Sequence, residues 1–122
     1  MDKAQALYSF WSDFDIPAYD VSSVPSDATM PYITYETGTD NLDNILILSA
    51  SLWYDSMSWK DISQKADEIA RRVEIMQPIP VSQGGYLWIT RGSPFMQRMS
   101  DPDNSRVRRI YINVQVEFLT AY

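Results

Sequence analysis

The chain has 122 residues, a net charge of −6, and neither cysteine nor histidine. This length is enough to bury a hydrophobic core, and we expect residues 1–122 to form a single domain. The missing residue types exclude disulfides, thiolate nucleophiles, the usual zinc-ligand sets and a catalytic triad that uses histidine. No apolar run approaches the length of about 20 residues that spans a bilayer, so we expect no membrane partner.

The charge is unevenly distributed along the chain. Residues 1–57 contain nine acids and one base, a net of −8, and residues 58–122 contain nine bases and seven acids, a net of +2. An acidic chain is a poor candidate for gripping phosphate backbones. The asymmetry is compatible with head-to-tail pairing between copies. The simpler interpretation, which we favour from the sequence alone, is a chance distribution of solvated surface charge.

The first third of the chain predicts one helix and one strand. Leu7, Phe10, Trp11 and Phe14 have the spacing of one helical face, which predicts a helix over residues 2–14. Residues 15–31 contain three prolines and predict an extended connection. We expect a first or edge strand over 32–37 and a turn-rich loop over 37–44.

The middle of the chain predicts a strand that leads directly into a helix. Residues 45–54 alternate between an apolar face and a mixed face, which is typical of a half-buried strand. Ser58 with Asp61 three residues later resembles a capping box. Apolar residues then recur at helical spacing to Val73, at positions 62, 66, 69 and 73.

The last third predicts two strands separated by a long loop. Gly84-Gly85 indicates a turn into a short strand over 86–90, and residues 91–106 are then predicted as a loop. Residues 107–119 alternate strictly between apolar and polar side chains, which predicts a long final strand. Its polar face is formed by Tyr111, Asn113, Gln115 and Glu117.

These elements predict an α+β fold in the order helix, strand, strand, helix, strand, strand. The economical architecture is a mostly antiparallel four-stranded sheet with the two main helices packed on one face. The opposite face, which carries Tyr111, Asn113, Gln115 and Glu117, would then face solvent or a channel.

The sequence offers no catalytic, cofactor-binding or metal-binding motif. Its paired carboxylates lie in turn-like stretches, and Asp101 to Ser105 lacks the glycine and the bidentate acid of a calcium loop. We therefore predict a protein that is not an enzyme and has no cofactor. Arg106, Arg108 and Arg109 could form a nucleic-acid patch with Tyr111, or could protect a strand edge or contact an acidic neighbour.

The segment 91–106 carries apolar and basic residues that a solvated loop does not need. Methionine, phenylalanine and arginine are common at protein interfaces, although these side chains could also fold back on the core. We predict contacts with other subunits or with a tail tube through this loop and through the loop 37–44. The residues are Arg91, Phe95, Met96, Arg98, Met99, Asp101, Asp103, Asp40 and Asp43. Trp53 or Trp59 could face a partner, whereas Trp11 and Trp88 are expected in the core.

Several segments, in order and across nearly the whole chain, resemble the tail terminator proteins of long-tailed bacteriophages, also called minor capsid or head–tail joining proteins. The similar segments are residues 16–19, 30–35, 46–62, 66–69, 88–95 and 109–118. They include Asp-Ser-Met-Ser-Trp-Lys-Asp-Ile at 55–62 and Trp-Ile-Thr-Arg-Gly-Ser-Pro-Phe at 88–95. Each segment alone has low specificity, so the resemblance depends on their combined coverage.

The resemblance implies a structural protein of the virion tail or neck, assembled in the host cytoplasm. Such a protein forms a homo-oligomer, usually a hexameric ring, on the end of the tail tube. There it stops polymerisation of the major tail tube protein and presents a surface to the head–tail connector protein. By this analogy Tyr111, Asn113, Gln115 and Glu117 would line a channel through which DNA passes without specific binding. The alternatives are another neck protein, such as a head-completion or adaptor ring, a tube subunit, or an acidic regulator or inhibitor.

Overall fold

The computed structural model describes residues 2–38, 45–81 and 84–119. Within them the elements follow in the order α1, β1, β2, β3, α2, β4, β5 and β6. The helices are α1 (Lys3–Trp11) and α2 (Lys60–Ile75). The strands are β1 (Ala18–Asp20), β2 (Tyr32–Tyr35), β3 (Ile45–Asp55), β4 (Ile79–Pro80), β5 (Tyr86–Ser100) and β6 (Val107–Leu119).

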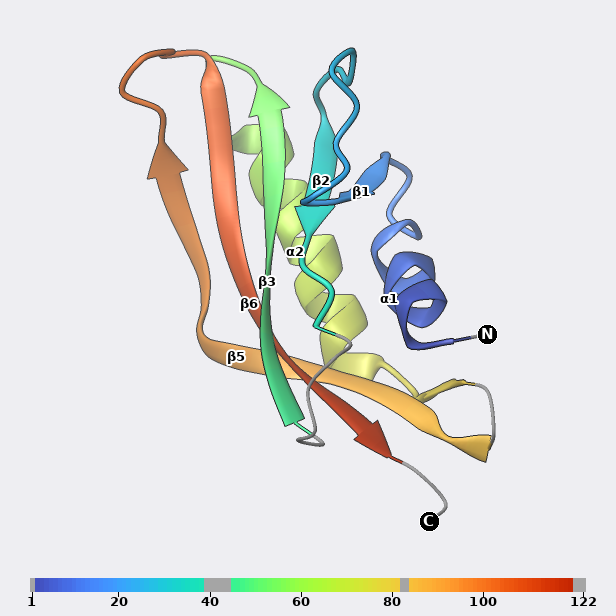
Figure 1. Cartoon of the computed structure of the whole chain (residues 1–122). Helices are drawn as coiled ribbons and strands as arrows, with labels where there is room; N and C mark the ends of the chain where they lie inside the picture. The colour runs from blue at the N-terminus through green and yellow to red at the C-terminus, as the bar shows by residue number, and fades with distance from the viewer. Residues whose placement is uncertain (1, 39–44, 82–83, 120–122) are drawn as a thin grey trace.

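The described strands form one six-stranded mixed sheet in the order β1-β2-β3-β6-β5-β4. Strand β1 runs parallel to β2, and the remaining neighbours are antiparallel. The sheet curls, and both helices lie on the same side of it (Figure 1). The expected four-stranded, mostly antiparallel sheet is therefore wrong.

Three local features explain the difference. Strands β1 and β4 are so short that their sequences carry no alternation to reveal them. Strand β5 does not end at Thr90 but continues to Ser100, so the predicted loop 91–106 is mostly strand. A bulge after Arg91 interrupts its pattern, and pairing with β6 resumes at Met96.

The two long central strands have the faces that their alternation predicts. In β6 the side chains of Ile110, Ile112, Val114, Val116 and Phe118 are buried. In β3, Leu46, Leu48, Ala50 and Leu52 are buried opposite them. These residues form the sheet side of the core. Their burial stabilises the fold, because removing apolar area from water contributes about 25 cal/mol per Å².

The helices complete the core from the other side. Ala6, Leu7, Phe10 and Trp11 of α1 and Ile62, Ala66, Ile69 and Val73 of α2 are buried. Phe14 is fully buried just beyond the end of α1, where Asp15 has a left-handed backbone conformation (φ 63°) that turns the chain. The Lys65 ammonium group donates to the Phe14 carbonyl at 2.6 Å and so ties α2 to this turn.

The helix starts are only partly as expected. In α1, Asp2 and Gln5 form a reciprocal capping box, which satisfies two free backbone donors. The capping box predicted for Ser58 and Asp61 is wrong, since Trp59 occupies the N-cap position of α2 without a side-chain cap. The Ser58 hydroxyl accepts instead from the Lys60 amide at 3.0 Å.

Candidate assembly surfaces

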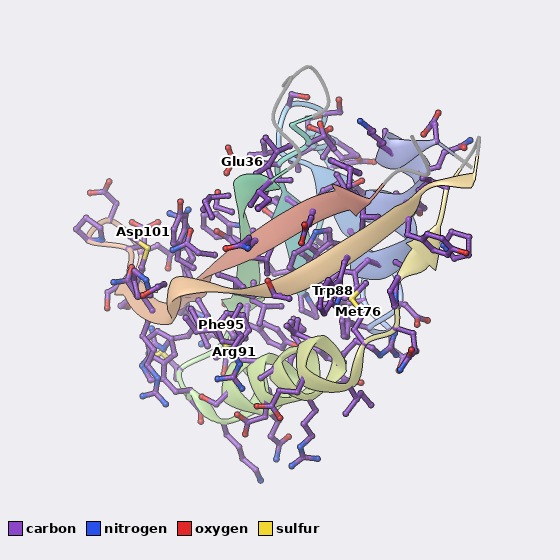
Figure 2. All side chains as sticks on the ribbon, turned by 90° about the horizontal axis from the view of Figure 1, so that it is seen from below. Glu36, Met76, Trp88, Arg91, Phe95 and Asp101 are labelled. Carbon is purple, nitrogen blue, oxygen red and sulfur yellow. The ribbon has the colours of Figure 1, made fainter. Side chains whose placement is uncertain are left out.

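The part of β5 that was predicted as an interface loop contacts α2 and the core through some of its side chains, while most of its residues are exposed. Arg91 forms an ion pair with Glu74 of α2, and its guanidinium lies 4.9 Å from the centre of the Phe95 ring. Phe95 and Met96 are half-buried against the core. Figure 2 shows Arg91 and Phe95 on the α2 side of the sheet. The interpretation that the apolar residues of this segment fold back on the core therefore fits Phe95 and Met96, whereas Met99 is 41% exposed.

Arg98 extends this contact toward the start of α2. Its guanidinium donates to the Ser63 hydroxyl at 3.2 Å and lies 5.0 Å from the centre of the Trp59 ring. Arg108 approaches the same ring at 5.4 Å and donates to the Met57 carbonyl at 3.0 Å. Trp59 thus contacts two guanidinium groups and stabilises the junction between β5, β6 and α2 by cation–π attraction.

The bulge in β5 is organised by Asn113. Arg91 pairs with Val114 and Met96 pairs with Ile112, so residues 92–95 all lie opposite Asn113. Its side-chain amide donates to the Pro94 carbonyl at 3.0 Å. Asn113, which was predicted to line a channel, is thus engaged in holding the bulge.

The connection between β5 and β6 is an ordered turn. The Asp101 carboxylate accepts from the Asp103 amide at 2.8 Å, and the Asp101 carbonyl accepts from the Asn104 amide. Arg106 then reaches Asp55 at the end of β3 with an Nε to Oδ1 distance of 2.8 Å. Figure 2 shows Asp101 at the far tip of the hairpin. Asp40 and Asp43, the other predicted contact acids, lie outside the described residues.

The sheet face away from the helices, the outer face, has an aromatic part. Arg109 lies 4.6 Å from the Trp53 ring and 5.5 Å from the Tyr111 ring, and its Nε donates to Ser51 at 3.1 Å. The Trp53 indole donates to Thr34 at 2.9 Å. Met99 and Gln97 of β5 are in register with Arg109 and Tyr111. Tyr111, a predicted channel residue, therefore lies beside a fixed arginine, and Trp53 contacts its own sheet.

The other part of the outer face exposes apolar side chains. Four large ones are exposed there, which we call the outer apolar row: Ile45, Ile47, Tyr86 and Trp88. Gln115 and Glu117 lie between them on β6, because Ile45 and Trp88 both pair with Glu117, and Ile47 and Thr90 both pair with Gln115. Trp88 is 40% exposed, so its expected place in the core is wrong, whereas Trp11 is buried as predicted.

The alternation within β3 and β5 already contains a signal for the outer apolar row. Leu87 and Ile89 are buried, so alternation places Tyr86 and Trp88 on the opposite face. The same argument places Ile45 and Ile47 with Ser49 and Trp53. Alternation alone does not join the two pairs, because only the sheet order brings β3 and β5 to the two sides of β6.

Two shallow hollows lie on the helix side of the molecule, and they share Arg72 and Ile75. The first, of about 360 Å³, is lined by Gln64, Asp67, Glu68, Arg71, Arg72 and Ile75. The second, of about 320 Å³, is lined by Ser9, Phe10, Asp13, Arg72, Ile75, Met76, Gln77 and Ile79. Ile75 is 73% exposed between them, and we call the combined surface the Ile75 hollow.

Three side chains in the described part of the chain have a shifted pKa, and each shift has a local structural cause. Hydrogen bonds to the Asp20 carboxylate from the backbone and hydroxyl of Ser22, and from Thr37, lower its pKa. Burial raises the pKa of Tyr35 and of Tyr54.

Among the described residues there is no cluster of three or more His, Cys, Asp or Glu side chains that could hold a metal ion. No helix of the described part is long and apolar enough to span a bilayer.

No protein-family model matches this chain, and no curated protein sequence matches it.

Proposed function

We propose that this protein is a bacteriophage tail terminator. It forms a ring, most simply a hexamer, on the end of a completed tail tube. There it stops polymerisation of the major tail tube protein and offers a surface to the head–tail connector protein. Its place is then the tail or neck of the virion, after assembly in the host cytoplasm.

The observation that carries the proposal is the outer apolar row. Ile45, Ile47, Tyr86 and Trp88 are exposed on two strands that flank β6, on the face that neither helix covers. Several large apolar side chains that are exposed on one face of a folded domain favour a protein–protein contact there. The uncovered sheet face therefore supports a role in protein assembly.

The sequence resemblance gives this general assembly role its specific form. The segments similar to tail terminators include most of β3, the first part of β5 and most of β6, which are the strands that present the outer face. The resemblance therefore includes Ile47 and Trp88 of the outer apolar row, whereas Ile45 and Tyr86 lie just outside the similar segments.

The proposed passage of DNA through the ring is supported by charge. With a net charge of −6, the chain repels phosphates and does not trap them. Of the four residues predicted to line the channel, Asn113 holds the bulge and Tyr111 contacts Arg109. Gln115 and Glu117 lie between apolar neighbours, which favours a protein contact at this end of the face.

Electron microscopy of particles made when this gene is deleted tests the proposal. A tail terminator predicts overlong or headless tails beside full heads. Tails of normal length with unjoined or leaking heads would move the protein to the head side of the neck. Intact infectious particles would overturn the structural role and would favour an acidic regulator.

A further inference from the structure

We draw no further inference here: the strongest candidate, the outer apolar row on the sheet face that neither helix covers, is an unpartnered apolar surface, and nothing in the described part of the chain shows what covers it.

Discussion

Gly92 lies directly against the backbone of Asn113. A Cβ atom on residue 92 would stand 2.7 Å from the Asn113 carbonyl oxygen and 2.8 Å from its carbonyl carbon. No side chain fits that space, so the bulge of β5 depends on glycine at this position.

Gly92→Ala should therefore destabilise the fold. Either the bulge or β6 must shift, and we expect a loss of about 1–3 kcal/mol in the free energy of unfolding. Urea unfolding followed by circular dichroism measures this loss. Ser93→Ala, at the exposed neighbouring residue, is the control and should change stability little. An unchanged midpoint for Gly92→Ala would mean that the bulge adapts freely.

Ile47 and Leu48 are neighbours in β3 on opposite faces of the sheet, at 64% and 8% exposure. Leu48→Ala should cost about 2–5 kcal/mol because it leaves a cavity in the core. Ile47→Ala should stay within about 0.5 kcal/mol of wild type. Thermal unfolding of the two variants under one set of conditions compares them. A large loss from Ile47→Ala would show that the outer apolar row serves the fold and not assembly.

Arg109 contacts two aromatic rings and Ser51 on the outer face. Arg109→Ala should cost about 1 kcal/mol, and a double-mutant cycle with Trp53→Ala should give a coupling of about 0.5–1 kcal/mol. Arg71→Ala, at an exposed arginine, is the matched control and should be nearly neutral in the monomer. A coupling energy of zero would show that the stacking of Arg109 on Trp53 adds no stability.

Asp20 should make stability depend on acid pH. Its pKa is lowered in the folded chain, chiefly by the Ser22 backbone and hydroxyl and then by Thr37, so the unfolded chain takes up the proton first as pH falls. The stabilisation is present above the ordinary pKa of 3.8 and is lost as pH falls through the lower folded value. Ser22→Ala should raise the Asp20 pKa in a carbon-detected NMR titration. An unmoved titration midpoint would contradict this cause.

The long elements could be predicted from the sequence because their periodicity is sustained. The alternation of β3 and β6 and the helical spacing from Ile62 to Val73 correspond to the buried faces of the structure. Short strands were missed because three residues in β1 and two in β4 are too few to show a period. Their pairing is set by tertiary contacts, such as the Ile33 amide donating to the Pro17 carbonyl at 2.8 Å.

The candidate surfaces were harder to predict than the elements. Gly92, Ser93 and Pro94 are typical of a loop, and only the register with β6 shows that the strand continues beyond them. The predicted contact residues Arg91 and Arg98 face α2, which depends on how a helix far away in sequence packs. The apolar row required the sheet order, which alternation within one strand does not contain.

Tail length decides between a terminator and the alternative roles. A phage with this gene deleted is complemented with wild-type protein, with Ile47→Asp or with the control Met57→Asp, and tails are measured by electron microscopy. A terminator that assembles through the outer apolar row should give uniform tails joined to heads with wild type and the control. Overlong or headless tails are expected with Ile47→Asp and with no protein. Uniform, head-joined tails in the uncomplemented deletion would contradict the terminator role.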